Sequence, residues 1–256
     1  MTRVIKIGGR PQSDASLAST LATYWTVARA NGGMVLVHGG GDEVSLLQAT
    51  LGGSTKFVNG RRVTSEHDID VVRMALSGSA NKRLVSRLIE NGIEAVGLSG
   101  EDASLLSALP MDVEHLGFVG APTTVNVAFL RHLLGGGYMP VVSPVSRDAS
   151  GVMGTALNVN GDDAAAAIAA ALQAAELLFV TDVEGVQRDG ALVSSLTPAD
   201  AKQLLANGTA VGGMRAKLEA ALAAVEGGVR RVRISDIAAI TDATRGTVVH
   251  DSSILS

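Results

Sequence analysis

Hydrophobic residues in this chain follow two patterns, short apolar runs and longer stretches with apolar positions three or four residues apart. The short runs predict strands at residues 2–9, 35–37, 94–98, 139–143, 177–181, 229–234 and 247–249. The longer stretches predict helices at residues 13–30, 43–51, 66–77, 80–91, 127–134, 162–172, 198–206 and 214–226. Because strands and helices alternate, we expect an α/β fold with right-handed crossovers and a mainly parallel central sheet.

Local signals refine three of these segments. Ser13 and Asp14 are the predicted cap of the helix at residues 13–30. Asn59 and Gly60 lie between two β-prone segments, which is the strongest short signal for a hairpin. Residues 104–119 predict a second hairpin.

Two of the predicted strands end in glycines, and a predicted helix follows each of them. These segments are T-R-V-I-K-I-G-G at residues 2–9 and M-V-L-V-H-G-G-G at residues 34–41. Backbone amides beside a helix N-terminus attract anions, although glycines also end strands in many ordinary strand–turn–helix units. The sequence contains neither a P-loop nor a complete dinucleotide-binding fingerprint. A phosphate bound here would be held by Lys6, Gly8, Gly9, Gly40 and Gly41.

Three later segments carry further polar groups. In N-V-N-G-D-D, at residues 158–163, the side chains could cap the following alanine-rich helix, or a carboxylate could hold lysine ammonium groups. T-D-V-E-G-V, at residues 181–186, follows a strand, where α/β sheets bind ligands. G-G-M-R-A-K, at residues 212–217, opens a helix, so Lys217 could extend to solvent or meet a bound phosphate.

The arginines also allow more than one interpretation. Arg61, Arg62 and Arg73 could form a solvated face, or an arginine on the hairpin could clamp a carboxylate. The arginines within residues 230–233 lack interleaved aromatic residues, and we interpret them as a solvated strand edge.

The composition narrows the range of functions. The chain has no cysteine, which excludes disulfides, thiolate catalysis and cysteine-based zinc sites, and its five histidines show no metal-ligand spacing. Its net charge of -4 argues against nucleic acid or an anionic membrane as the main partner. No apolar run approaches the ~20 residues needed to span a bilayer. Because no signal-peptide pattern precedes the first strand, we expect a cytoplasmic protein.

The order of these motifs resembles the amino-acid kinase family and, within it, the N-acetylglutamate kinases. The matching segments are K-I-G-G (6–9), H-G-G-G (38–41), N-G-R-R-V-T (59–64), G-S-A-N-K (78–82), G-L-S-G (97–100), G-Y-M-P-V-V-S (137–143), N-V-N-G-D (158–162), T-D-V-E-G-V (181–186) and G-G-M-R-A-K (212–217). Each segment is a weak signal alone, but the ordered set spans nearly the whole chain and is specific. The hairpin motif favours acetylglutamate over the other substrates of the family.

The resemblance implies a single domain, an open three-layer α/β/α sandwich. Residues 1–157 would bind the amino acid and mediate dimerisation, and residues 158–256 would bind ATP. The implied reaction is ATP-dependent phosphorylation of the γ-carboxylate of N-acetyl-L-glutamate to N-acetylglutamyl 5-phosphate, a step of arginine biosynthesis. Mg²⁺ would be held mainly by the nucleotide phosphates.

The resemblance also assigns roles to residues by their position in the motifs. Lys6 and Lys217 would neutralise charge on the transferring phosphoryl group, and Asp162 would orient both lysines. The substrate would be bound by Gly40, Gly41, Arg62 and Asn158. The nucleotide would be bound by Gly8, Gly9, Thr181, Asp182, Val183, Glu184, Gly185, Val186, Thr209, Ala210 and Val211. The four glycines of the two strand ends would contribute backbone amide donors.

Members of the family that are inhibited by arginine carry a helix before the first strand, whereas here the strand begins at once. We therefore expect a homodimer that arginine does not inhibit. Two alternatives to this function stay open: a kinase acting on an aminoadipate derivative in lysine biosynthesis, possibly carrier-protein-linked, and a non-catalytic sensor of amino acids or nucleotides. The presence of Lys6, Asp162 and Lys217 together speaks against the sensor.

Overall fold

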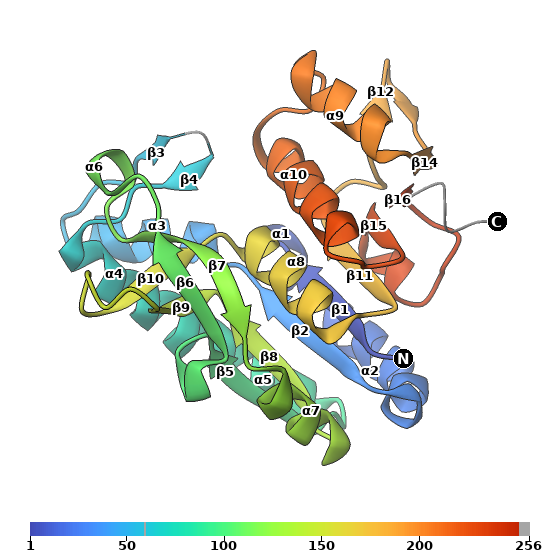
Figure 1. Ribbon diagram of the computed structural model, residues 1–256. Helices are drawn as coiled ribbons and strands as arrows, with labels where there is room; N and C mark the ends of the chain where they lie inside the picture. Colours follow the sequence, from blue (N-terminus) through green and yellow to red (C-terminus); the bar gives the residue numbers. More distant parts are fainter. Residues whose placement is uncertain (59, 251–256) are drawn as a thin grey trace.

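The computed structural model describes residues 1–58 and 60–250, and its largest element is an eight-stranded sheet (Figure 1). In spatial order the strands are β14 (Ser195–Leu196), β16 (Thr247–Val249), β15 (Val232–Ser235), β11 (Glu176–Val180), β1 (Arg3–Ile7), β2 (Met34–His38), β8 (Met139–Ser143) and β5 (Ala95–Ser99). Neighbouring strands run parallel except β15 and β16. The predicted α/β fold with a mainly parallel central sheet is confirmed.

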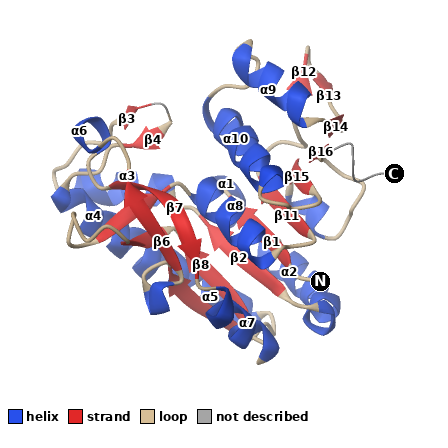
Figure 2. Ribbon diagram, in the orientation of Figure 1, coloured by secondary structure: helices blue, strands red, loops and turns tan. Residues whose placement is uncertain are grey.

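Helices cover both faces of this sheet (Figure 2). In chain order the α-helices of the described residues are α1 (Gly9–Gln12), α2 (Leu17–Ala28), α3 (Gly41–Thr50), α4 (Glu66–Arg73), α5 (Asn81–Glu90), α6 (Val113–Leu116), α7 (Val127–Gly135), α8 (Gly161–Leu172), α9 (Pro198–Ala206) and α10 (Gly212–Glu226). Within residues 1–58 and 60–250, no helix has both the length and the apolar character that crossing a membrane requires.

The three layers follow from the alternation of side chains along each strand. Val4 and Phe179 belong to the apolar cluster that the sheet forms with α7, α8 and α10. Ile5 and Leu178, one residue away from them, pack on the opposite face with α2 and α5. The predicted sandwich architecture is therefore present.

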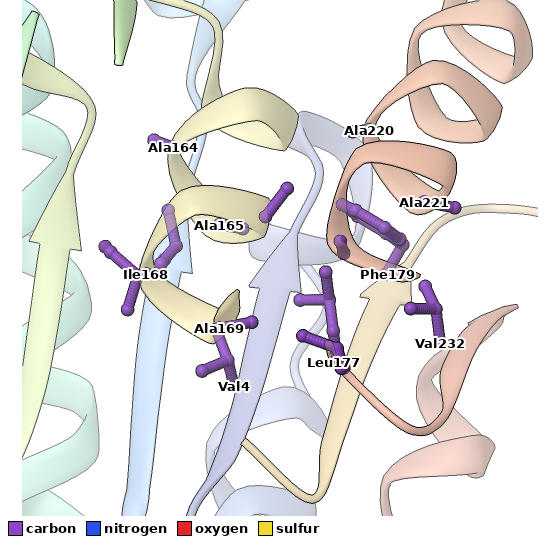
Figure 3. Packing of buried hydrophobic residues seen from close by; sticks show 14 of the residues in the cluster. Val4, Ala164, Ala165, Ile168, Ala169, Leu177, Phe179, Ala220, Ala221 and Val232 are labelled. Carbon is purple, nitrogen blue, oxygen red and sulfur yellow. The ribbon is translucent and has the colours of Figure 1, made fainter. Parts of the chain in front are cut away.

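Alanines bring α8 and α10 close together over β1 and β11. Ala165 and Ala169 of α8 and Ala221 of α10 are buried in one cluster with the strands beneath them (Figure 3). Small side chains allow helix backbones to approach closely while apolar surface is still removed from water. This packing holds the beginnings of α8 and α10 next to the end of β1.

A second group of strands closes into a small barrel. Its members are β6 (Leu106–Pro110), β7 (Val119–Val125), β9 (Val145–Asp148) and β10 (Ala156–Val159). β6 and β7 pair antiparallel, but α6 lies between them, so the bounds of the hairpin predicted at residues 104–119 are wrong. Gly120 and Pro122 weaken the strand pattern of β7, which explains why its length could not be seen in the sequence.

The first predicted hairpin is confirmed. β3 (Phe57–Val58) pairs antiparallel with β4 (Arg61–Arg62). Gly60 has a φ of 76°, in the left-handed region that tight hairpin turns require. Asn59, the other half of the predicted turn, lies outside the described residues. A further hairpin, β12 (Gln187–Arg188) with β13 (Ala191–Leu192), was not predicted.

The helix predictions need two corrections. The helix predicted at residues 13–30 begins at Leu17, and the Asp14 carboxylate accepts a hydrogen bond from the Ser16 amide at 2.8 Å instead of capping it. This local turn competes with helix formation, as short polar side chains often do. The break predicted between two helices near residue 78 is absent, since a π-helical segment, Met74–Ala80, joins α4 directly to α5.

The predicted solvated edge at residues 230–233 is wrong for Arg233, which is completely buried. The Arg233 Nε donates to Glu176 at 2.6 Å, and the Arg3 Nε lies 2.5 Å from the other oxygen of the same carboxylate. Three of the four remaining N–H groups of Arg233 donate to backbone carbonyls of residues 239, 242 and 245. This buried guanidinium is tolerated because its charge is paired with a carboxylate and most of its donors are hydrogen-bonded.

Candidate active site

Three charged side chains meet at the carboxyl edge of the central strands. Lys6 lies near the end of β1, Asp162 in the first turn of α8, and Lys217 in the second turn of α10. The Lys6 Nζ is 2.8 Å from one oxygen of the Asp162 carboxylate, and the Lys217 Nζ is 3.5 Å from the other. All three residues are at most 9% exposed. The convergence of residues 6, 162 and 217 that we expected is therefore present.

The electrostatics of this cluster follow from burial and from mutual contact. Burial alone would raise the pKa of the Asp162 carboxyl, but Lys6 and Lys217 outweigh it and hold that pKa below its ordinary value. Burial lowers the pKa of the Lys217 ammonium; Asp162 opposes this shift and Lys6 adds to it. Two ammonium groups on one carboxylate leave a local excess of positive charge, which can attract an anion.

A cavity of about 190 Å³ lies beside this cluster. Its walls include Lys6, Gly39, Gly40, Gly41, Val44, Phe57, Gly60, Arg61, Arg62, Val72, Leu76, Val119, Pro144, Asn158, Val159, Asn160, Gly161 and Asp162. The four predicted substrate-binding residues are all among them. The cavity combines apolar walls with a few polar groups, as small-molecule sites commonly do.

The structure distinguishes among the three arginines considered above. Arg73 is bound by Glu101 at 3.0 Å and by Asp70 at 2.6 Å, outside the cavity. Arg61 forms an ion pair with Asp163 at 2.7 Å.

Arg62 is buried; its guanidinium carbon lies 5.0 Å from the centre of the Phe57 ring, and among the described residues its hydrogen-bond acceptors are neutral oxygens. Its guanidinium donates to Gln48 Oε1, Thr55 Oγ1, the Gly41 carbonyl and Ser45 Oγ at 2.6 to 3.1 Å. Burial lowers the pKa of Arg62, and the more distant charges of Asp68 and Asp42 oppose that shift. These contacts use four of the five N–H groups of Arg62, so its positive charge and its Nε–H remain for a carboxylate at the wall of the cavity.

The glycine loops differ in the amides that they leave available. The amide of Gly8 donates to the Val180 carbonyl at 3.1 Å, so the prediction that Gly8 offers an amide donor is wrong for this conformation. Gly40, with a φ of 149°, precedes α3, whose first-turn amides have no intrahelical acceptor. A Cβ at Gly40 would approach a Leu76 methyl to 2.7 Å, so glycine suits this position for steric as well as conformational reasons.

Sequence reasoning missed the polar pair that supports the second glycine loop. Burial lowers the pKa of His38 to about 4, so its imidazole is neutral. The His38 Nε2 lies 3.0 Å from the Asn81 amide nitrogen, which makes Nε2 an acceptor and leaves Nδ1 to donate to the Gly39 carbonyl at 2.8 Å. The asparagine of G-S-A-N-K was the available signal in the sequence, but asparagine is also common at exposed turns, so its burial could not be predicted.

The predicted nucleotide-binding residues lie outside this cavity. Residues 181–186 follow β11, and residues 209–211 immediately precede α10, the helix that carries Lys217. Asp182 pairs with Arg10 at 2.6 Å, and both side chains are largely exposed. These two segments lie on the side of α10, while the cavity lies on the side of the hairpin, whose residues line it.

Comparison with known proteins decides the family. The model of the amino acid kinase family matches residues 1–236. The chain belongs to this family.

Individual relatives cover most of the chain. It is 44% identical to an acetylglutamate kinase of Geobacillus kaustophilus (strain HTA426) over 233 residues, 91% of this chain and 89% of that protein. Among solved structures, smu.665 from Streptococcus mutans UA159 superposes with a TM-score of 0.86 at 28% identity and covers 97% of this chain and 98% of its own. An N-acetylglutamate synthase from Neisseria gonorrhoeae, complexed with coenzyme A and N-acetyl-glutamate, superposes with a TM-score of 0.82 at 28% identity. That superposition covers 98% of this chain and 59% of the synthase.

Proposed function

We propose that this chain is an acetylglutamate kinase, which transfers the γ-phosphoryl group of ATP to the γ-carboxylate of N-acetyl-L-glutamate. The products are N-acetylglutamyl 5-phosphate and ADP, and the reaction belongs to arginine biosynthesis. The observation that carries the proposal is the Lys6–Asp162–Lys217 cluster beside a cavity of small-molecule size. The similarity to acetylglutamate kinases over about nine-tenths of the chain supports the choice of substrate.

The proposed reaction requires neutralisation of negative charge rather than proton transfer. A carboxylate is already ionised at neutral pH, so it attacks the γ-phosphorus without a general base. The new bond forms between a carboxylate oxygen and the γ-phosphorus while the bond to the leaving oxygen of ADP breaks. The barrier comes from bringing two anions together and from charge on the phosphoryl oxygens, so positioning and cations supply the catalysis. In the proposal Lys6 and Lys217 provide these cations.

Asp162 acts in the proposal as a positioning residue for both lysines. Its carboxylate lies within 3.5 Å of both ammonium groups, which supports this role. Arg62 would bind the α-carboxylate of the substrate, with Asn158, Gly40 and Gly41 around the rest of the molecule. The hairpin β3–β4 would form a lid over this site.

ATP would bind on the side of α10, through Gly9, Thr181–Val186 and Thr209–Val211, and it would lie close to Gly8 without using the amide of that residue as a donor. Within residues 1–58 and 60–250 no group of three histidine or acidic side chains is placed to hold a metal ion. In the proposal Mg²⁺ is held mainly by the nucleotide phosphates, where it neutralises part of their charge. In the same proposal residues 1–157 bind the amino acid and form a homodimer, residues 158–256 bind ATP, and the enzyme works in the cytoplasm.

The test is ADP formation by the purified protein with ATP, Mg²⁺ and one candidate acceptor at a time: N-acetylglutamate, glutamate, aspartate, UMP or N-acetylaminoadipate. We expect turnover with N-acetylglutamate, and a kcat lower by ~10²-fold or more in Lys6→Ala and Lys217→Ala. Lys202→Ala, at an exposed lysine of α9, is the matched control. Turnover with the aminoadipate derivative alone, or binding without turnover, would replace the proposal with one of the two alternatives.

A further inference from the structure

An ion pair joins the hairpin to the helix that carries Asp162. The Arg61 Nη1 donates to the Asp163 Oδ2 at 2.7 Å, across 102 positions of sequence. The two side chains are 25% and 20% exposed, so the pair is largely withdrawn from solvent. A charge-assisted bond in such a place contributes more than an ion pair on an open surface.

Asp163 is not needed to cap α8 or to place a negative charge at its start. The Asn160 side chain already caps this helix, accepting from the Asp162 amide at 2.8 Å, and Asp162 already places a negative charge in its first turn. A second, partly buried carboxylate adds a cost, because partial burial and the neighbouring charges of Asp162 and Glu219 disfavour its ionised form. Arg61 is the group that opposes this cost, so the two residues depend on each other.

The hairpin is held at its base and on one side by other contacts. At the base, the Thr64 amide donates to the Leu116 carbonyl at 2.9 Å, and the Phe118 amide donates to the Thr64 carbonyl at 2.7 Å. On one side, Arg62 reaches α3 through Gly41 and Ser45. The Arg61–Asp163 pair supplies an attachment to the opposite wall of the cavity, where Gly161 and Asp162 lie.

We propose that the Arg61–Asp163 ion pair latches the β3–β4 hairpin onto the first turn of α8 and so holds the amino-acid cavity closed. Arg61 and Asp163 are positioning residues, since they act through the hairpin and through α8. Only the identity of the substrate that the latch encloses rests on the proposed function. Closure fixes Arg62, on the same strand as Arg61, at one end of the cavity and the Lys6–Asp162–Lys217 cluster at the other.

The first test needs no substrate. Hydrogen exchange is measured at the Val63 amide, which donates to the Lys56 carbonyl at 2.9 Å beside the hairpin, in the wild type and in Arg61→Met and Asp163→Asn. We expect exchange to be faster in both variants by on the order of tenfold, the effect of losing one charge-assisted hydrogen bond. Arg29→Met is the control, because it breaks an exposed arginine–carboxylate pair, with Glu94, that is away from the cavity. Unchanged exchange in both the Arg61→Met and the Asp163→Asn variants overturns the latch.

The second test separates positioning from general damage to the fold. In ADP formation with N-acetylglutamate, we expect each single variant to raise the KM for the amino acid on the order of tenfold, with a much smaller change in kcat. The double variant should be no worse than either single variant, since both remove the same bond, and Arg61→Lys should recover much of the loss. Additive effects, or a loss confined to kcat, overturn the latch. If the wild type lacks turnover but exchange still responds to the variants, the proposed function fails and the latch stands.

Discussion

Asparagine in place of Asp162 tests the central electrostatic argument. The substitution keeps the size of the side chain and removes the charge that two buried ammonium groups share. Lys6 and Lys217 then repel each other with no carboxylate between them. We expect both the stability of the fold and the catalytic rate to fall.

The distances give the magnitude. At an effective dielectric constant of about 20, attraction to the carboxylate is about 6 kcal/mol for Lys6 and about 5 kcal/mol for Lys217. Most of this is offset by the cost of burial, and removal of one partner from a buried ion pair costs about 3–5 kcal/mol of stability. For kcat, misplacing the cations on the phosphoryl group should cost about 10²- to 10³-fold, comparable to losing an oxyanion donor.

The same substitution should also shift the pH dependence of kcat in a defined direction. Burial already lowers the pKa of Lys217, and Asp162 is the main group that opposes this shift, with a smaller contribution from Asp182. Without Asp162 the pKa of Lys217 falls further, so kcat measured as the pH rises should begin to decline at a lower pH than in the wild type. The assay is ADP formation at saturating substrates across neutral and alkaline pH, with a thermal melt to confirm folding. A folded variant with an unshifted alkaline decline and a kcat near wild type would refute the reasoning.

The remaining predictions concern two other buried charges. Arg62→Lys keeps the charge but loses the planar fork, so the KM for N-acetylglutamate should rise by about 10- to 100-fold while the KM for ATP stays constant; an unchanged amino-acid KM would remove Arg62 from the substrate site. Glu176→Gln leaves Arg3 and Arg233 without their shared carboxylate and should cost about 3–5 kcal/mol, a Tm lower by on the order of 10 °C. Glu176 begins β11, at the end of the strands opposite to the active-site cluster, so kcat of the folded protein should be unchanged. A kcat that falls together with the Tm would contradict this.

The elements that carry the site could be predicted because their signals are local. β1 and β2 are apolar runs that end in glycines, and α8 is an alanine-rich stretch behind polar caps. The contact among Lys6, Asp162 and Lys217 could not be predicted from local sequence. From the residues alone, Asp162 could equally cap a helix and Lys217 could extend to solvent; only the family resemblance placed them together. Their contact depends on the parallel pairing of β1 with β11 and on the close approach of α8 to α10.

The errors about charged residues share a physical cause. The sequence shows that a side chain is charged, but it does not show whether the fold places an oppositely charged side chain beside it. Residues 231–234, R-V-R-I, alternate charged and apolar positions, as a half-exposed strand would, yet both faces of β15 are buried. Arg233 is tolerated there because Glu176 begins the neighbouring strand and Arg3 begins the next one. A charged residue at the start of a buried strand is a weak signal, but opposite charges at the starts of adjacent parallel strands are a stronger one. The same reasoning applies to Arg61 and Asp163: neither is informative alone, and their pairing becomes visible only when the hairpin and α8 face each other across the cavity.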